Sequence, residues 1–409
     1  MFWHQPGLCI TPSWNQDSKN LKNDNEKRTK RAKNSRQKTG INSKIEYAVI
    51  KEEKEKNLED TNSKNYVKEI INEISSEDMN LFPKRLANVT KFVGAHVSMA
   101  GGVHNAIKNS LSIGANAFAI FLKNQRRWES PPLNTDHISS FQSLCIKHDY
   151  PAKYILPHGN YLVNLANPDE EKREKSYQAF LDDLKRCEAL GLVLYNFHPG
   201  STVGMCSVDQ AIQNISDCIN RAHGETIGIT CVVENMAGQG NSIGSKFEEL
   251  GEIISRVKDK SRIGICFDTC HAFAAETMSK FDQHVGFQYL KGMHLNDSTL
   301  ELGSNRDRHQ NIGEGHLGLE AFRLIMNDDR LNEIPLILET PLADDKTFND
   351  WKKEIELLYG LVGKKSLIGP SISSSLSNDN STTENNISKI RKAKILPSSP
   401  NNYNYNCQS

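Results

Sequence analysis

Eight apolar, strand-like runs alternate with helix-like stretches along the middle of the chain, and this alternation limits the fold more than any other feature. The runs cover 91–96, 116–122, 153–158, 194–199, 230–235, 263–268, 289–297 and 334–340. Amphipathic stretches such as 170–191 and 245–257 separate them. Such alternation is typical of a parallel sheet whose strands are joined by helices. Eight units in about 270 residues fit a closed (β/α)8 barrel, the TIM barrel, better than an open doubly wound sheet.

The two ends of the chain lack this alternation. Residues 1–90 are polar, and 363–409 is rich in Ser and Asn. Segments of this composition bury too little apolar surface to offset their conformational entropy. We therefore predict a barrel domain over 91–362, between a disordered N-terminal extension 1–90 and a disordered C-terminal tail 363–409.

Composition sets few limits on partners. Lys plus Arg and Asp plus Glu both number 50, so net charge does not argue for a nucleic-acid partner. The nine cysteines are scattered without a CxxC pair, which favours reduced intracellular thiols over a disulfide framework. No apolar run reaches the roughly 18–20 residues that span a bilayer, so no membrane partner is expected.

A basic run in the extension bears on location. Residues 27–38 contain seven Lys or Arg, a pattern typical of nuclear-import signals and of loose nucleic-acid-binding arms. A solvated tail without such a role is the alternative. We predict a nuclear protein, and a mitochondrial pool stays open although Asp17, Asp24 and Glu26 argue mildly against a transit peptide.

Metal-capable side chains end nearly every strand-like run. They are His96, His158, His198, Glu234, Asp268, His294 and Glu339, joined by His271 just after Asp268 and by Asp307 and His309 after the seventh run. The carboxyl ends of barrel strands meet at one face, so these residues are expected to line one pocket. Each alone has an ordinary alternative, such as Asp268 capping a helix. Together, several carboxylates at one mouth would repel one another unless cations neutralised them. A set of imidazole and carboxylate ligands suits zinc or manganese at a catalytic site.

Short motifs along the barrel region carry a specific resemblance. In chain order they are GAHVSMAGG, KNQRRW, LPHGNYL, NFHPGS, VENMAGQG, FDTCHAFAA, MHLNDS, DRHQNIGEG and LILET. Over residues 92–340 the chain resembles the endonuclease IV family, the zinc-dependent apurinic/apyrimidinic endonucleases of base-excision repair. The resemblance implies a monomer that cuts double-stranded DNA on the 5′ side of an abasic site. It also implies 3′-hydroxyl and 5′-deoxyribose phosphate products, and trimming of blocked 3′ ends.

The resemblance further implies three zinc ions, with Mn²⁺ also suited to one position. It assigns the first ion to His158 and His198, the second to Asp268, His294 and Glu339, and the third to His271, Asp307 and His309, with Glu234 bridging the first two ions. Zinc lowers the pKa of bound water to about 7, so Glu234 would be the catalytic carboxylate that seats a metal-bound hydroxide. His96 lies outside this set and is expected either to line the site or to contact a ligand from behind.

Two loops are candidates for reading DNA. The first, 123–128, is basic and aromatic, and the second, 159–162, follows a ligand directly. A solvated loop with one packed Trp is the ordinary alternative for the first. By resemblance, Arg126, Tyr161 and Leu162 enter the double helix while the abasic nucleotide is flipped out.

Two other functions stay open from the residues. A divalent-metal sugar isomerase or epimerase can share the barrel, although it would not need His271, Asp307 and His309. A DNA-binding barrel with structural metals is the other, although structural zinc sites are usually rich in Cys.

Some local features depart from, or compete with, the family pattern. The segment 276–288 is short and predicts little room for a full helix before the seventh run. Gln310 and Asn160 stand at positions that vary from the family pattern without being ligands. The glycines of GEGHLG, 313–318, match GxGxxG by letter, but they do not follow a strand directly, so we expect no dinucleotide site.

Overall fold

The computed structural model describes residues 68, 82–271, 275–343 and 347–367. The barrel belongs to the unit that lies within residues 73–409. Most of the predicted extension and tail lies outside the described residues, so the disorder of those segments stays a prediction.

A parallel sheet of seven strands forms the centre of the unit that contains the barrel. Its strands are β1 Phe92–His96, β2 Ala117–Ala119, β3 Leu194–Phe197, β4 Thr230–Glu234, β5 Ile263–Asp268, β6 Leu290–Leu295 and β9 Pro335–Leu338. They lie in the order β2-β1-β9-β6-β5-β4-β3, and each neighbouring pair is parallel. The short strands β7 Asp297–Ser298 and β8 His309–Gln310 form a separate antiparallel pair.

Residues 155–158 close this sheet into a barrel between β2 and β3. Parallel bridges join His158 to Phe121 on one side and to Asn196 on the other. The Asn196 N–H donates to the Pro157 carbonyl at 2.8 Å. Pro157 has no N–H of its own, which limits this segment to isolated bridges instead of a regular ladder. The predicted (β/α)8 barrel is confirmed, with its third run pairing through isolated bridges, of which another joins Ile155 to Phe118.

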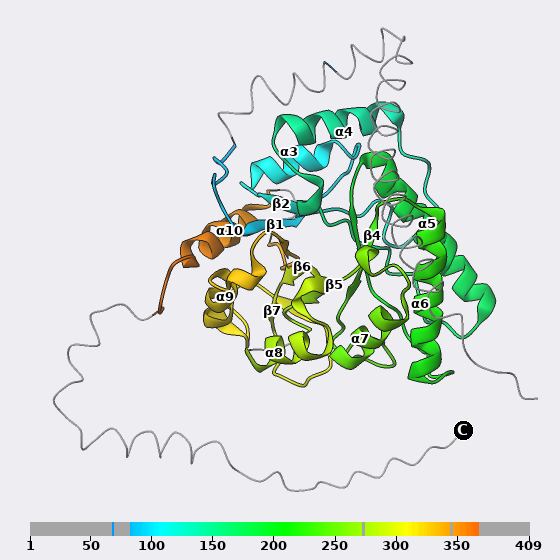
Figure 1. Cartoon of the computed structure of the whole chain (residues 1–409). Helices are drawn as coiled ribbons and strands as arrows, with labels where there is room; N and C mark the ends of the chain where they lie inside the picture. The colour runs from blue at the N-terminus through cyan, green and yellow to red at the C-terminus, as the bar shows by residue number, and fades with distance from the viewer. Residues whose placement is uncertain (1–67, 69–81, 272–274, 344–346, 368–409) are drawn as a thin grey trace, which may run out of the picture. The chain divides into compact units, whose positions relative to one another are not determined.

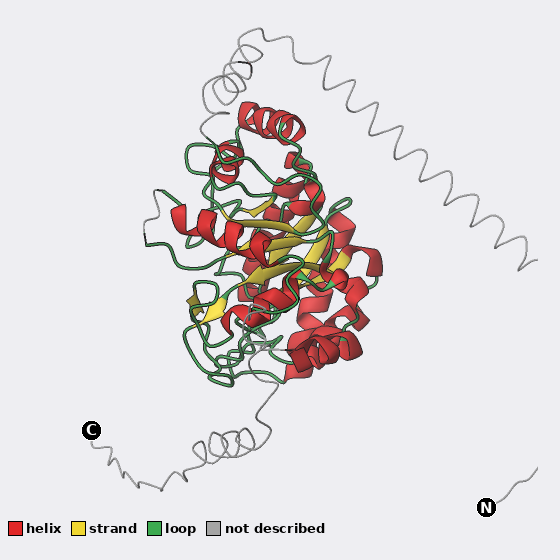
Figure 2. Cartoon of the chain, turned by 90° about the vertical axis from the view of Figure 1, so that its left-hand side faces the viewer, coloured by secondary structure: helices red, strands yellow, loops and turns green. Residues whose placement is uncertain are grey.

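Helices surround the strands in chain order, as Figure 1 shows, and Figure 2 shows them flanking the strands on both sides. They are α3 Asn105–Ser112, α4 Thr135–Lys147, α5 Glu170–Leu190, α6 Val208–Glu225, α7 Phe247–Arg256, α8 Ala275–His284, α9 Gly318–Met326 and α10 Asn349–Leu361. Local signals set the ends of α5. Asp169 accepts the Lys172 N–H at its start, and Gly191 ends it in the left-handed conformation at φ 74°.

Helix α8 corrects one expectation. The short segment 276–288 predicts little room for a full helix, yet α8 runs over ten residues, Ala275–His284. The buried Phe281 ring packs against the Phe247 and Phe267 rings, with centroids 5.5 and 5.6 Å apart. This contact with α7 and β5 seats a short helix against the barrel wall.

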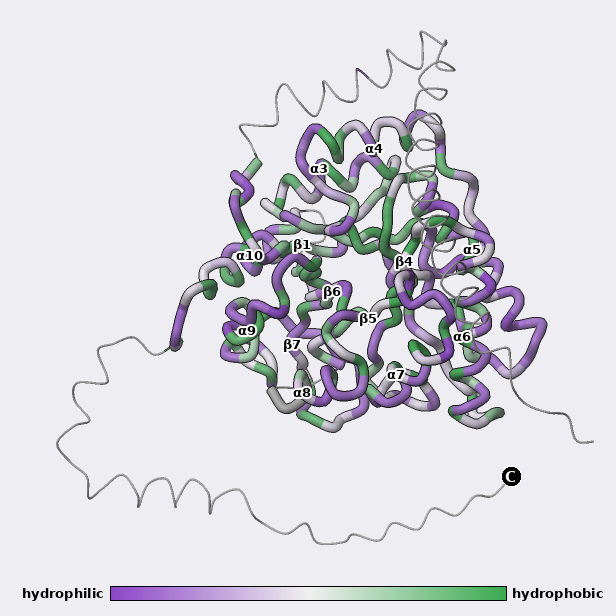
Figure 3. Tube along the Cα trace, in the orientation of Figure 1, coloured by the Kyte–Doolittle hydropathy of each residue, from purple (hydrophilic) through white to green (hydrophobic). Residues whose placement is uncertain are grey.

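The barrel interior below the strand ends is apolar. In Figure 3 hydrophobic colour follows the strands, whereas the helices alternate between hydrophilic and hydrophobic colour. The interior cluster comprises Ala117, Ala119, Tyr154, Leu156, Leu194, Val232, Cys266 and Ile337, contributed by several strands. Burying a side chain such as Val, Leu or Ile contributes about 1.5–3 kcal/mol. The barrel is therefore filled by a packed core, and polar chemistry is confined to its ends.

Residues 82–90, predicted as part of the extension, pack against the barrel. Arg85 Nε donates to Asn116 Oδ1 at 3.0 Å, and the guanidinium lies 4.1 Å from the Tyr150 ring centroid. Asn116 Nδ2 in turn donates to the Leu86 carbonyl at 3.2 Å. The folded unit therefore begins before the predicted boundary at 91.

Two findings concern the environment of the chain. Among the described residues, no helix combines the length and the apolar character that crossing a membrane requires. The cysteines in the described residues are all free.

Candidate metal centre

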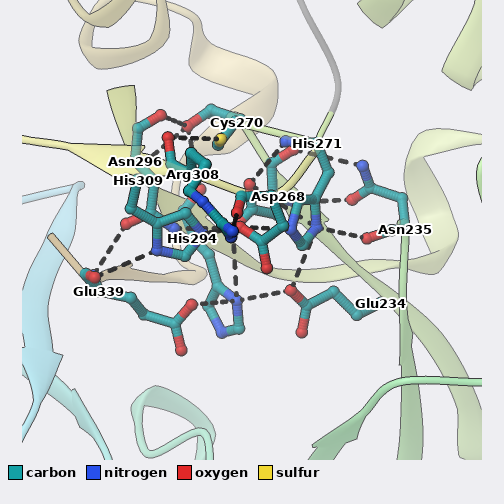
Figure 4. A network of polar contacts seen from close by, with 12 residues as sticks. Glu234, Asn235, Asp268, Cys270, His271, His294, Asn296, Arg308, His309 and Glu339 are labelled. Carbon is teal, nitrogen blue, oxygen red and sulfur yellow. Dashed lines mark hydrogen bonds and ion pairs between the residues drawn. The ribbon is translucent and has the colours of Figure 1, made fainter. Parts of the chain in front are cut away.

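Nine His, Asp and Glu side chains from different elements meet at the mouth, the carboxyl-terminal end of the barrel. They are His158, His198, Glu234, Asp268, His271, His294, Asp307, His309 and Glu339. Figure 4 shows part of this group joined in one network of polar contacts. Register explains the proximity of neighbours, because Asp268 on β5 pairs directly with His294 on β6. His309 reaches the mouth from β8, and Asp307 from the segment just before that strand.

Glu234 stands between two groups of histidines. Its Oε2 lies 3.2 Å from His158 Nε2 and 3.6 Å from His198 Nε2. Its Oε1 lies 3.1 Å from His294 Nδ1 and 3.6 Å from His271 Nδ1. The carboxylate is 1% exposed, so a buried charge faces imidazoles on both sides. This is the arrangement that a carboxylate shared between two cations requires.

Glu339, just beyond β9, joins His96 to the same network. Its Oε2 lies 3.2 Å from His294 Nδ1, while its Oε1 lies 3.2 Å from His96 Nδ1. The His96 ring also stacks on Phe121, with centroids 4.0 Å apart. His96 therefore contacts a ligand-type carboxylate from behind and is itself held in place by an aromatic ring.

A third group forms around Asp307. Its Oδ1 lies 2.9 Å from His309 Nε2 and 3.4 Å from His271 Nε2. Both Nε2 atoms are buried without hydrogen-bond geometry to a partner. Three donor atoms that approach one another without bonding directly fit a cation placed between them.

Asp268 has two separate tasks. Its Oδ1 accepts the His271 backbone N–H at 2.9 Å, a local turn contact between residues three apart. Its Oδ2 accepts from Asn296 Nδ2 at 2.7 Å and lies 3.8 Å from His309 Nε2. The turn contact thus fixes the carboxylate while its second oxygen faces the mouth.

The charges of these groups are strongly coupled. Burial acts to raise the pKa of Glu234, but the neighbouring His294 and His198 hold it well below its usual value. Burial acts to lower the pKa of His271, but Asp268 and Asp307 outweigh it and raise the pKa to about 10. The mouth therefore favours ionised carboxylates balanced by positive charge.

The donor set fits divalent metal ions such as zinc. In one triplet, His158, His198 and Glu234, the donor atoms lie within 4.8 Å of one another, and the same holds for the triplet around Asp307. Zinc takes imidazole and carboxylate ligands of this kind, with an open position at catalytic sites. Deprotonated ligands bind the cation, so metal and protons compete for the same imidazoles.

Two cysteines beside these groups escaped the sequence prediction. Cys266 lies with Glu234 and His294, and Cys270 with Asp268 and His309. Burial raises the pKa of the Cys266 thiol to about 12 and that of Cys270 to about 11. Both thiols are therefore protonated near neutral pH in the chain without metal.

Asparagines next to the ligands also escaped prediction. Asn196 Nδ2 donates to Glu234 Oε2 at 2.6 Å, and Asn235 Oδ1 accepts the Asp268 N–H at 2.7 Å. Asn296 Oδ1 accepts the Glu339 N–H at 3.1 Å. Each of these asparagines lies within two residues of the end of a strand, close in the chain to a candidate ligand. That position is the signal by which the sequence could have identified them.

The structure places the predicted DNA-facing residues beside the mouth. Arg126 is exposed, and the Tyr161 and Leu162 side chains are 55% and 36% exposed. Tyr161 also lies against the His158 and His198 rings, with centroids 5.7 and 5.8 Å apart. An exposed aromatic side chain thus borders the candidate metal ligands directly, and an exposed leucine follows it in the chain.

Lys123, in the basic loop, does not face solvent. Its ammonium is buried and lies 3.0 Å from Asp182 Oδ2 and 3.2 Å from Asp183 Oδ1, both on α5. Trp128 stacks under Lys175, whose Nζ is 4.7 Å from the ring centroid. These contacts leave Arg126 and Arg127 as the exposed charges of the loop.

The GxGxxG-like motif wraps an internal carboxylate. The Asp297 carboxylate accepts backbone N–H groups from Gly313, Gly315, Leu317 and Gly318 at 2.8–3.2 Å. A Cβ on Gly315 would lie 2.4 Å from Asp297 Oδ1, so this close approach requires glycine. The donors that would cradle a phosphate in a dinucleotide site here hold the hairpin beside Asp307.

Comparison with known proteins shows which family shares this sequence and fold. A sequence model of the xylose isomerase-like TIM barrel family matches residues 107–361. "Probable endonuclease 4" of Chlorobium phaeovibrioides is 51% identical over 66% of this chain and 99% of its own length. The crystal structure of endonuclease IV from Thermus thermophilus aligns with a TM-score of 0.58 and 30% identity, over 66% of this chain and 99% of that one.

A longer relative shares the same region. "Apurinic-apyrimidinic endonuclease 1" of Plasmodium berghei is 55% identical over 67% of this chain and 56% of its own length. The chain therefore spans about half the length of the curated Plasmodium relatives it matches.

Proposed function

Because the chain belongs to the endonuclease IV family of xylose isomerase-like TIM barrels, we propose that it is a DNA-repair endonuclease. It hydrolyses the phosphodiester bond on the 5′ side of an abasic site in double-stranded DNA, leaving a 3′ hydroxyl and a 5′ deoxyribose phosphate. It also trims blocked 3′ ends. The observation that carries this proposal is the position of Glu234, buried between two histidine groups at a mouth bordered by exposed DNA-facing residues.

The proposed metal content is three zinc ions, with Mn²⁺ able to replace zinc at one position. His158 and His198 hold the first, and Glu234 links it to the second. The remaining ligands are Asp268, His294 and Glu339 for the second ion, and His271, Asp307 and His309 for the third. Zinc in these positions supplies a Lewis acid and a water with a pKa near 7, which gives a nucleophile at neutral pH.

The chain's own residues contribute position and charge. Asn196 fixes one Glu234 oxygen by hydrogen bond, which leaves the carboxylate in a single orientation toward the mouth. Arg126 supplies positive charge for backbone phosphates, which orient a nucleic acid without reading its sequence. Tyr161 and Leu162 offer apolar surface to the base stack, which favours a site where no base is paired.

A sugar isomerase or epimerase shares the barrel but accounts for less of the mouth. It has no need for the third group around Asp307, nor for an exposed tyrosine and leucine beside the ligands. A barrel with purely structural metals would favour a set of thiolate ligands, whereas the donor groups here are mainly His, Asp and Glu. An endonuclease function therefore accounts for more features of the mouth than either alternative.

One assay separates these functions. A duplex with a single tetrahydrofuran abasic analogue is incubated with the purified chain, with and without a chelator, and the product ends are mapped. We expect one cut on the 5′ side, lost with the chelator and restored by zinc. Elemental analysis should find about three zinc ions per chain. An intact duplex in the presence of zinc, or full activity with one ion or none, would contradict the proposal.

We further propose that the enzyme acts as a monomer on double-stranded DNA in the nucleus. The basic run 27–38 is the sequence feature that supports the location. A mitochondrial pool is the alternative that tagging experiments would reveal.

A further inference from the structure

The two DNA-facing loops are joined by a single buried side chain. The loops are 123–131, which carries Arg126, and 159–163, which carries Tyr161 and Leu162. Asn160 lies in the second loop and is 7% exposed. Its Nδ2 donates to the Asn124 carbonyl at 2.9 Å and to the Arg127 carbonyl at 2.7 Å, so it holds the first loop on either side of Arg126.

The same amide also shapes its own loop. Asn160 Oδ1 accepts the Leu162 N–H at 2.8 Å, and the Asn160 carbonyl accepts the Val163 N–H at 3.1 Å. These contacts form a turn around Tyr161 and direct two consecutive side chains outward. One primary amide therefore uses both hydrogens on one loop and its oxygen on the other.

The outer side of loop 123–131 is anchored separately. The Lys123 ammonium is fixed by α5, as described above, and Arg186 on the same helix donates to the Ser130 and Pro131 carbonyls at 3.2 and 3.0 Å. These contacts hold the two ends of the loop. The middle, with Arg126 at its tip, is held toward the mouth by Asn160.

We propose that Asn160 is a positioning residue that couples the two loops into one DNA-recognition unit. The proposal rests on the function proposed above and adds a residue that itself has no need to touch DNA. Ordering flexible side chains and loops on binding costs free energy, and a preformed surface avoids that cost. With the amide in place, Arg126 and the Tyr161–Leu162 pair meet the duplex in a fixed relation.

Two substitutions separate the coupling from the local turn. Asn160→Ala removes all three side-chain hydrogen bonds. Asn160→Asp keeps an oxygen for the Leu162 N–H but cannot donate to the Asn124 and Arg127 carbonyls. The matched control is Asn327→Ala, because Asn327 also donates to two carbonyls and accepts one N–H, between α9 and α10, away from the mouth.

The first measurement needs no catalytic activity. Brief trypsin digestion, followed by mass spectrometry, measures the rate of cleavage after Arg126 and Arg127. Losing two hydrogen bonds should release the loop and raise this rate about tenfold in both Asn160 variants, with the control unchanged. Equal rates in all four proteins would overturn the proposal. Zinc content and thermal unfolding confirm that each variant is folded and loaded.

The second measurement compares incision of an abasic duplex with incision of the same site opposite a gap. We expect kcat/KM on the duplex to fall roughly tenfold in both Asn160 variants, mainly through KM, and much less on the gapped substrate. Asn160→Asp behaving like wild type on the duplex would assign the effect to the local turn and overturn the coupling. An equal loss on both substrates would do the same.

A double-mutant cycle tests whether Asn160 and Arg126 act together. If Asn160 acts through Arg126, its substitution should cost clearly less in an Arg126→Ala background than in wild type. Fully additive losses from the Asn160 and Arg126 substitutions would mean that Asn160 does not act through Arg126. Wild-type protein that leaves the abasic duplex intact would instead refute the proposed function, while the trypsin rates would still decide whether Asn160 holds the loop.

Discussion

The candidate metal centre and the two loops proposed to face DNA lie side by side, yet they are built in different ways. The metal-centre residues stand at or near strand ends, where parallel pairing fixes their spacing, as it does for Asp268 and His294. The loops depend on individual side chains such as Asn160 and Lys123. One region is therefore positioned by many backbone hydrogen bonds, while the other can be released by one substitution.

The two regions also differ in exposure. Glu234 and His294 are 1% and 0% exposed, whereas Tyr161 is 55% exposed. Electrostatic interactions are stronger away from water, so a buried mouth suits charge stabilisation. Exposed rings and guanidinium groups can reach a large substrate. Bond breaking and recognition should therefore be separable by mutation.

The largest effect is expected from Glu234→Gln. Glutamine offers a neutral carbonyl in place of the anion between the two histidine groups, so neighbouring cations would repel one another. Mutating a residue that only contacts a metal ligand from behind typically lowers metal affinity or activity by about 10- to 100-fold. Because Glu234 is proposed as a ligand itself, incision should fall by more than about 100-fold. The measurement is kcat/KM on an abasic duplex, together with zinc content and circular dichroism.

Glu225→Gln is the matched control for that substitution, because Glu225 accepts from the Tyr177 hydroxyl at the far end of α6. It should leave incision unchanged. A Glu234→Gln variant that cuts within tenfold of wild type would mean that Glu234 does not bridge.

A smaller effect is expected from replacing Tyr161 and Leu162 together with Ala. Each stacking contact typically contributes about 1–3 kcal/mol, so duplex binding should weaken roughly 5- to 150-fold. Zinc content should not change, since no ligand is touched. The informative quantity is the ratio of kcat/KM on duplex to that on gapped substrate.

Ile146 and Ile227 provide the control pair, since both are exposed apolar side chains outside the mouth. Their double Ala variant should bind and cut normally. If the Tyr161–Leu162 variant loses kcat/KM equally on duplex and gapped substrates, those two residues do not act by entering the base stack.

The smallest catalytic effect is expected outside both regions. A chain that starts at residue 80 keeps the contacts of Arg85 with the barrel and removes the basic run 27–38. It should incise at the wild-type rate in vitro and lose nuclear enrichment when tagged in cells. A start at residue 87 would also remove Arg85 and should lower the melting temperature. Normal nuclear accumulation of the residue-80 chain would remove the import-signal hypothesis.

Much of the fold was predictable because strand and helix periodicities are local. The runs ending at His96, Glu234 and Asp268 become β1, β4 and β5. The run ending at His158 instead pairs through isolated bridges, because Pro157 interrupts the ladder. The short α8 was missed, since its stability comes from Phe281 packing on other elements and not from its own length.

Residue type and the order of the strand-like runs were enough to identify which residues could meet at the mouth. Parallel strands bring their carboxyl ends to one face, so residue type at a strand end carries long-range information. The contacts around these residues follow from three-dimensional packing. It buried Lys123 against α5, wrapped Asp297 in backbone N–H groups, and aimed the Asn160 amide at another loop. Those outcomes depend on side-chain geometry between segments far apart in the chain, which no local pattern encodes.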